Sequence, residues 1–122
     1  RLLVFALDGK AKLPPGPGRT LKIEAQDDPA MRIDAAMAEA GKPQFLACAL
    51  CHGRDVISAG SPAPDLRESA LALDQETFLQ VVKGGALIER GMPRYDAMSR
   101  EQAMQLWHYV RQESRRAAQK GG

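Results

Sequence analysis

The sequence has 122 residues, enough for one domain and too few for a second, separate substrate domain. Charged residues make up 26% of the chain, aromatic residues 5%, and the formal net charge is +2. These values exclude a disordered chain, a membrane bundle and a strongly basic nucleic-acid-binding domain, so no nucleic acid is expected as a partner. The two cysteines, Cys48 and Cys51, would close too short a loop to staple a disulfide-rich fold.

The N-terminal part predicts an extended arm that belongs to a neighbouring structure. Within residues 1–13 the apolar run LLVFAL favours a β-strand, and Asp8-Gly9 is a turn signal. A strand without a partner in this chain indicates the terminal strand of a missing domain. The run PPGPG that follows is typical of a stiff linker, which we expect to occupy residues 14–28.

Helical patterns begin after the linker. Asp28 as an N-cap and Pro29 in the first turn predict a helix start. Gly41 and Pro43 are expected to interrupt this helix, because both residues weaken a helix interior. A second, short helix that carries Cys48 is expected to follow.

A third helix is expected between two long loops. Asp74 caps it, and it runs to Lys83, where a glycine pair stops it. The flanking loops, residues 53–70 and 86–98, are longer than is usual in a compact domain. We infer that something other than side chains fills the middle of the fold.

The last helix is expected over residues 100–118. Ser99 and Gln102 form a capping box at its start. One apolar face of this helix is formed by Leu106, Tyr109 and Val110. Residues 119–122 are expected to be a disordered tail, so the whole outline is all-α, with short helices and long loops.

The sequence Cys48-Ala49-Leu50-Cys51-His52 is the attachment motif for c-type haem. Two thiols one helical turn apart can each add to a vinyl group on one edge of a porphyrin. The next residue, His52, is then placed to ligate the iron from the proximal side. Both cysteines and one of the 2 histidines lie within this motif, which favours a haem site.

Other uses of the cysteine pair fit the sequence less well. A thioredoxin-like site needs a βαβ context, which the helical pattern does not provide. A zinc site needs four ligands, and only His108 remains outside the motif. A buried pair of cysteines in a helical interaction domain without haem stays open.

The second axial ligand is expected from the later part of the chain. Met92 lies between Gly91 and Pro93, whose backbones can hold a thioether against iron. A methionine more often fills a core, so four alternatives stay open, namely Met31, Met37, Met98 and Met104. His108 is a weaker candidate, because it lies in mid-helix and is expected at the surface.

At these residues the chain resembles the class I cytochrome c family. The resemblance covers residues 29–118 and rests on the attachment motif, on Pro64-Asp65-Leu66 and on Gly91-Met92-Pro93. It implies a fold of short helices and long loops around one covalent haem c. It also implies that the Pro64 carbonyl accepts a hydrogen bond from the proximal histidine and that Leu66 packs on the haem.

A few other side chains carry weaker signals. The family usually has an aromatic residue where this chain has Gln44, and that departure bears on how the first and last helices cross. Arg67 and Arg94 are candidates for the haem propionates, although exposed positions are the simpler expectation. Trp107 fits either a core or a docking face. The basic residues over 111–120 are expected to be a solvated helix end.

A closer resemblance comes from the flanking sequence FALDGKAKLP at residues 5–14. It is similar to the last propeller strand of alcohol dehydrogenases of the quinohaemoprotein type, which depend on pyrroloquinoline quinone (PQQ) and carry a C-terminal cytochrome domain. The resemblance implies a missing PQQ- and calcium-containing domain as electron donor, and a periplasmic location. The implied acceptor is a copper protein, a cytochrome or a membrane respiratory chain, and no catalysis is expected from this chain alone.

Two other functions stay open beside electron transfer within such an enzyme. The chain can be a free-standing soluble cytochrome c that exchanges electrons with separate proteins. It can also be a small haem peroxidase, which would require an acid–base residue over an open distal position. His108 is the only histidine left for that role.

Overall fold

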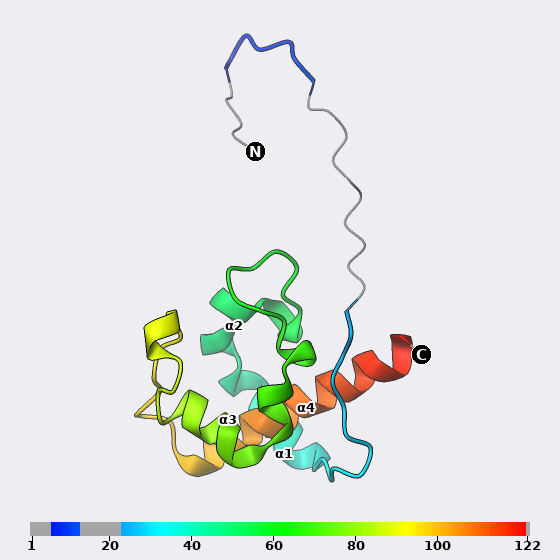
Figure 1. Cartoon of the computed structure of the whole chain (residues 1–122), viewed down its shortest axis with the longest axis vertical. Helices are drawn as coiled ribbons and strands as arrows, with labels where there is room; N and C mark the ends of the chain where they lie inside the picture. The colour runs from blue at the N-terminus through cyan, green and yellow to red at the C-terminus, as the bar shows by residue number, and fades with distance from the viewer. Residues whose placement is uncertain (1–5, 13–22, 122) are drawn as a thin grey trace.

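The computed structural model describes residues 6–12 and 23–121 of the chain. Within these ranges the regular elements are helices and helical turns, without a β-strand, so the all-α prediction is confirmed. The α-helices are α1 (Ala35–Gln44), α2 (Leu46–His52), α3 (Gln75–Val82) and α4 (Arg100–Gly121) (Figure 1).

The N-terminal arm is described only in part. Residues 2–5 of the strand predicted over residues 2–7, and the PPGPG run at residues 14–18, lie outside the described residues. A turn at Leu7 and Asp8 is described, and in it the Gly9 N–H donates to the Ala6 carbonyl at 3.0 Å. The boundaries of the arm and of the linker therefore stay predictions.

Helix α1 starts later than the sequence pattern predicts, which corrects the helix start at Asp28-Pro29. Its N-cap is Asp34, whose carboxylate accepts from the N–H groups of Ala36 at 2.9 Å and Met37 at 3.0 Å. Asp28 instead accepts from the Ala30 N–H at 2.9 Å in a local turn. An Asp side chain stabilises both a turn and a helix start, so the presence of Asp28 in the sequence does not tell which of the two forms.

Helices α1 and α4 cross at Gly41, which does not interrupt the helix as expected. A Cβ atom built on Gly41 would lie 2.0 Å from the Gln105 carbonyl oxygen, so the two backbones touch here. Helix α1 continues through Pro43 in its last turn and ends at Gln44. Packing against α4 outweighs the low helix propensity of glycine, and the close crossing forms although Gln44 replaces an aromatic residue.

The caps predicted for the last two helices are confirmed. The Asp74 carboxylate accepts from the Thr77 N–H at 2.7 Å at the start of α3. Ser99 and Gln102 exchange two hydrogen bonds of 2.8 and 3.0 Å at the start of α4. Helix α4 continues to Gly121, so the disordered tail expected from residue 119 is wrong for the described part.

Four short 3-10 turns interrupt the segments predicted as loops. They are η1 (Arg54–Val56), η2 (Leu66–Glu68), η3 (Ala70–Leu73) and η4 (Ile88–Arg90). The Trp107 side chain is 2% exposed and donates from Nε1 to the Ala72 carbonyl at 2.8 Å. Trp107 is therefore a core residue that joins α4 to η3.

The core lies on the inner face of α4, against α1, α2 and α3 (Figure 1). The apolar face predicted for α4 is confirmed, because Leu106, Tyr109 and Val110 are all buried. Phe45 packs on Tyr109 with ring centroids 5.6 Å apart. In the described part of the chain, no helix is both long enough and apolar enough to span a membrane.

Candidate haem site

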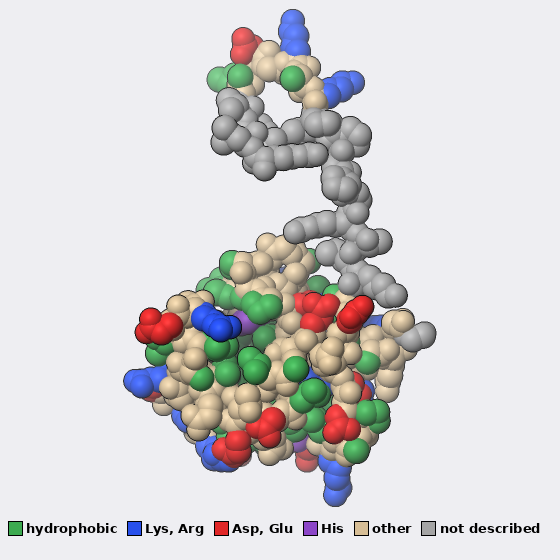
Figure 2. Space-filling view, viewed as in Figure 1, with side chains coloured by type: hydrophobic (Ala, Val, Ile, Leu, Met, Phe, Trp, Pro, Cys, Tyr) green, Lys and Arg blue, Asp and Glu red, His purple; other side chains and the backbone are tan. Residues whose placement is uncertain are grey.

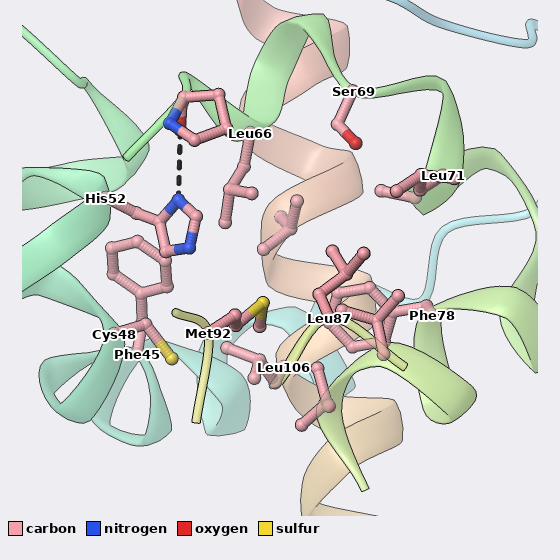
Figure 3. A pocket seen from close by; sticks show the side chains of 15 residues that line it. Phe45, Cys48, His52, Leu66, Ser69, Leu71, Phe78, Leu87, Met92 and Leu106 are labelled. Carbon is pink, nitrogen blue, oxygen red and sulfur yellow. Dashed lines mark hydrogen bonds between the residues drawn. The ribbon is translucent and has the colours of Figure 1, made fainter. Parts of the chain in front are cut away.

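A cavity between α2, the segment around η2 and η3, and the loop before α4 collects the residues that the sequence singled out. It is lined by Cys48, His52, Pro64, Leu66 and Met92, and a second hollow that adds Cys51 adjoins it. Figure 3 shows the His52 ring and the Met92 side chain both directed into this space. Three segments far apart in the sequence thus meet at one site.

The proximal side is organised by a hydrogen bond to His52. This residue ends α2, is 7% exposed, and its Nδ1 lies 2.9 Å from the Pro64 carbonyl oxygen (Figure 3). Because a carbonyl only accepts, Nδ1 carries the proton and Nε2 keeps a free lone pair. The ring is therefore in the tautomer that can bind a metal through Nε2. The hydrogen bond to the Pro64 carbonyl is the one that the family resemblance implied.

The two thiols of the attachment motif lie in different surroundings on α2. Cys48 is 8% exposed and faces the cavity, whereas Cys51 is exposed at its mouth. Burial, with a smaller contribution from Cys51, raises the pKa of the Cys48 thiol to about 11. Cys48 is therefore protonated at neutral pH, and both sulfurs border the same hollow.

The distal side is formed by a short glycine–proline loop. The Met92 N–H donates to the Leu87 carbonyl at 3.2 Å, across η4. Gly91 before it adopts a left-handed conformation with φ of 87°. This turn brings Met92 to the cavity, while Met31, Met98 and Met104 pack on the core without lining the cavity.

The cavity wall is almost wholly apolar and suits a large flat cofactor. Phe45, Phe78 and Val110 are among the residues that line the cavity, and pockets for large cofactors are lined mainly by such side chains. Figure 2 shows hydrophobic side chains gathered around the hollow, with acidic and basic side chains towards the edges of that face. An imidazole nitrogen and a thioether sulfur facing into apolar surroundings, with two thiols at the border, are a donor set that fits haem c.

His108 lies away from the cavity. It is partly buried, and its Nδ1 accepts from the Asp34 N–H at 3.2 Å where α1 begins. Its ring packs edge-on against Trp107, with centroids 4.9 Å apart. Burial lowers the pKa of His108, against a smaller opposing effect of Asp34. His108 thus binds the N-cap residue of α1 from a partly buried position and does not line the cavity.

The arginines differ from the sequence expectation in two places. Arg94 is exposed, as expected, and pairs with Asp96 at 2.5 Å. Arg67 is only 14% exposed, because its guanidinium forms two hydrogen bonds of 2.9 and 2.7 Å with Asp65. Arg111 is fully buried, so the solvated helix end predicted from residue 111 is wrong at that position.

Sequence reasoning missed the role of Asp65 beside the proximal proline. Its carboxylate accepts from the N–H groups of Ser58 at 3.1 Å and Arg67 at 3.0 Å. Burial by itself would raise the pKa of Asp65, but the hydrogen bonds with Arg67 and Ser58 outweigh it and hold that pKa below 3.8. The sequence signal was present in Pro64-Asp65-Leu66, since an Asp in a loop often accepts bonds from nearby N–H groups.

In the described part of the chain, no group of three or more His, Cys, Asp and Glu side chains forms a potential metal site. The side chains that can ligate a metal in the cavity are those of His52 and Met92, together with the two thiols.

Comparison with known proteins identifies a family that the chain matches. A sequence profile of the family described as cytochrome c oxidase, cbb3-type, subunit III, matches residues 29–110. The matched range contains the attachment motif, Pro64 and Met92, and it covers most of the four α-helices.

Alcohol dehydrogenases are among the known proteins whose sequences are similar to this chain. The quinohemoprotein alcohol dehydrogenase ADH IIB of Pseudomonas putida is 45% identical over 116 residues, which are 90% of this chain and 16% of that protein. The dehydrogenase subunit of the alcohol dehydrogenase (quinone) of Gluconobacter oxydans is 35% identical over 90% of this chain and 14% of its own length. The corresponding subunit of Acetobacter aceti is 37% identical over 78% of this chain and 12% of its own length. The chain therefore spans about one sixth or less of the relatives that it matches.

Proposed function

The chain belongs to this cytochrome c family and is an electron-transfer domain related to the haem domains of quinohemoprotein alcohol dehydrogenases, and we propose that it carries electrons singly from reduced PQQ to an external acceptor. The donor PQQ and its calcium ion belong to a dehydrogenase domain outside this chain. The acceptor is a small copper protein, a cytochrome or a membrane respiratory chain. The proposed location is the periplasm.

One observation carries the proposal. Cys48, the His52 ring bonded to the Pro64 carbonyl and the Met92 side chain line one apolar cavity, and Cys51 lines the hollow that adjoins it. Membership of the family implies a covalent haem c, whose iron supplies a one-electron Fe(III)/Fe(II) couple when it is bound. Cys48 and Cys51 would hold the haem, and His52 and Met92 would be its axial ligands.

The protein's own residues account for the rest of the mechanism. The His52–Pro64 hydrogen bond fixes the imidazole plane and increases the basicity of the ligating nitrogen. Leu66, Phe78 and Leu106 line the inner wall of the cavity and keep water from it. Cys51 and Tyr95 border the outer hollow, which is the route by which an electron partner approaches the cofactor edge.

A donor of the dehydrogenase type is favoured over a free-standing carrier by the relatives. Each of the three proteins compared above is an alcohol dehydrogenase or its dehydrogenase subunit, and each is far longer than this chain. A peroxidase is disfavoured, because His108 is bonded to the Asp34 N–H and does not line the cavity. Met92 also lies where a peroxidase needs an open distal position.

The first experiment tests haem attachment. A pyridine haemochrome spectrum of the purified protein is expected to show one haem c for each chain. A double variant, Cys48→Ala with Cys51→Ala, is expected to lose the haem on acidic acetone extraction, whereas the parent keeps it. A colourless protein with two free thiols would contradict the proposal.

The second experiment tests the donor and the location. In the full-length parent enzyme, an alcohol substrate is expected to reduce the haem at a rate that depends on added PQQ and calcium. Cell fractionation is expected to recover the haem protein with periplasmic markers. Reduction that is independent of PQQ would instead identify a free-standing carrier with another donor.

A further inference from the structure

The segment from residue 23 to residue 28, here called the strap, lies against the haem domain although the sequence predicts a linker there. It runs beside α4 in Figure 1. The Glu24 N–H donates to a Glu68 carboxylate oxygen at 2.8 Å, and the Gln26 N–H donates to the Arg67 carbonyl at 2.8 Å. The strap is therefore tied to η2 by its backbone.

Two arginines of α4 hold the other side of the strap. The guanidinium of Arg111, whose side chain is 0% exposed, donates to the Gln26 carbonyl at 2.5 Å and lies 3.5 Å from the Asp27 carboxylate. Arg115 donates to the same carboxylate at 3.0 Å and to the Asp28 carbonyl at 2.7 Å. A buried guanidinium that loses its partners is strongly destabilising, so Arg111 commits the strap to this position.

The residues of η2 that receive the strap also support the proximal ligand. Arg67 accepts from the strap with its carbonyl and donates to Asp65 with its side chain. The Asp65 carboxylate also accepts from the Ser58 N–H, and the Ser58 hydroxyl donates to the Ala63 carbonyl at 2.6 Å. Asp65 thus fixes both ends of the short turn that contains Pro64.

The last link is the hydrogen bond between Pro64 and His52. The carbonyl of Pro64 immediately precedes Asp65, and it lies 2.9 Å from His52 Nδ1. Three hydrogen-bonded contacts, linked covalently through Arg67 and through the Pro64–Asp65 peptide bond, therefore connect Gln26 to the imidazole that would ligate the iron. A shift of η2 would lengthen or bend the Pro64–His52 bond, which sets the donor strength of the ligand.

We propose that Gln26 and Asp65 are positioning residues for the proximal histidine, so that docking of the strap sets the orientation of His52 and the reduction potential of the haem. The proposal rests on the proposed haem ligation by His52. Loss of the bond at Nδ1 makes the imidazole a weaker donor, which destabilises Fe(III) relative to Fe(II) and raises the potential. In the proposed function the strap lies between the haem domain and the dehydrogenase domain that donates electrons, so a change in its docking would alter the haem.

The test uses the haem-loaded full-length protein and the variant Gln26→Pro. Proline removes the N–H that binds the Arg67 carbonyl and leaves the net charge unchanged. The ratio of Fe(II) to Fe(III) at a fixed applied potential is expected to rise about fivefold, or about 40 mV for a one-electron couple. The matched control is Ala25→Pro, which adds a proline next to the strap bond, keeps the Gln26 N–H and is expected to leave the potential unchanged.

A second variant tests the inner part of the same network. Asp65→Asn is expected to raise the potential and to change the ferric EPR g-values and the haem methyl hyperfine shifts, which report the plane of the His52 ring. Glu68→Gln removes the same charge three residues away and keeps an oxygen for the Glu24 N–H. Glu68→Gln is expected to leave the EPR g-values and the haem methyl shifts, here called the ring signature, unchanged. This control separates the positioning of His52 from the effect of a lost charge.

The outcomes decide between the alternatives. A changed potential and ring signature in Gln26→Pro and Asp65→Asn, with both controls unchanged, supports the proposal. Haem-loaded variants with the parent's potential and ring signature would overturn it, as would equal shifts in the controls. A parent protein without haem c in the pyridine haemochrome assay would instead overturn the proposed function, so the two failures are distinguishable.

Discussion

The two sides of the cavity hold their metal-binding side chains by different means. On the proximal side, His52 is bonded directly to the Pro64 carbonyl, and Asp65 and Ser58 brace the turn around that proline. On the distal side, Met92 is placed by a backbone turn through Gly91 and by packing. A thioether is only a weak hydrogen-bond acceptor, so packing is the main means available to orient it.

This difference teaches which property each side controls. The proximal side has a polar hydrogen-bond network, so a change there is expected to alter the orientation of His52 and the haem content and, through the Pro64–His52 bond, the potential. The distal side has a thioether on a short turn, so a change there is expected to alter the potential and to leave the proposed attachment at Cys48 and Cys51 intact. Single substitutions on each side are expected to separate the two contributions.

The largest effect is expected for His52→Ala. The variant loses the proximal ligand and the bond to Pro64, and haem c content per chain is expected to fall by more than about tenfold. The pyridine haemochrome assay measures this content. His108→Ala, which changes the other histidine and does not touch the cavity, is expected to keep full haem content. An equal loss in both variants would contradict the proximal assignment.

Replacement of the distal ligand is expected to act on the potential instead. Met92→Ala keeps the covalent haem but removes the sulfur-to-iron charge-transfer band of the ferric form. The midpoint potential is expected to fall by on the order of 0.1 V, since axial ligands tune haem potentials over ~0.8 V. Met98→Ala, which changes a core methionine, is expected to keep the band. Persistence of the band in Met92→Ala would assign the ligand to another methionine.

Asp65 in the proximal network is expected to make the free energy of unfolding depend on pH. At pH 7, Asp65→Asn is expected to lower the free energy of unfolding by about 2 kcal/mol, because a carboxylate with several hydrogen bonds is lost. The pKa of Asp65 is lowered in the folded state, so this stability is present above the unfolded-state pKa of about 3.9 and is lost as pH falls through the lower folded-state value. Denaturant titrations at several pH values are therefore expected to show that the difference in free energy of unfolding between the parent and Asp65→Asn disappears below about pH 4. A difference that does not change with pH would contradict a stabilising role of the ionised Asp65 carboxylate.

The distal turn can be tested through its backbone alone. Gly91 has φ of 87° and open space around the position of an added Cβ, so Gly91→Ala costs only conformational strain. We expect a loss of about 1 kcal/mol in the free energy of unfolding, measured by chemical denaturation. Gly121→Ala, at the end of α4 and also in open space, is expected to lose nothing. Equal effects would show that the left-handed turn is dispensable.

The smallest effect is expected away from both sides. Arg94 and Asp96 form an exposed ion pair, with side chains 50% and 65% exposed. Arg94→Gln is expected to change the free energy of unfolding by less than about 0.5 kcal/mol, because exposed pairs contribute little. The midpoint potential is expected to stay unchanged. A shift comparable to that of Met92→Ala would instead place Arg94 close to the haem.

The site was more predictable from the sequence than the ends of the elements. The attachment motif concentrates its information in five adjacent residues, and glycine and proline around Met92 mark a rigid turn, so local signals were sufficient. Pro64 and Leu66 followed only from the family resemblance. In the structure Cys48, His52, Pro64, Leu66 and Met92 line one cavity, and Cys51 lines the hollow that adjoins it.

The errors have a common physical cause, which is contact between distant parts of the chain. Arg111 looks like part of a basic helix end, and only Asp27 and Gln26, distant in sequence, make it a buried residue. Gly41 looks like a helix breaker until the backbone of α4 packs on it. Local patterns carry no information on such partners, so burial and helix continuity were misjudged there.

The backbone contact of α1 with α4 at Gly41 has a consequence for the variability of the domain. The backbones of α1 and α4 contact each other directly at Gly41. The long segments between α2 and α4 contribute core side chains but do not form this contact. The closure entropy of a flexible loop rises by only about 0.6 kcal/mol for each doubling of its length. A longer exposed loop therefore costs little, whereas a single methyl group at residue 41 would collide with the backbone of α4.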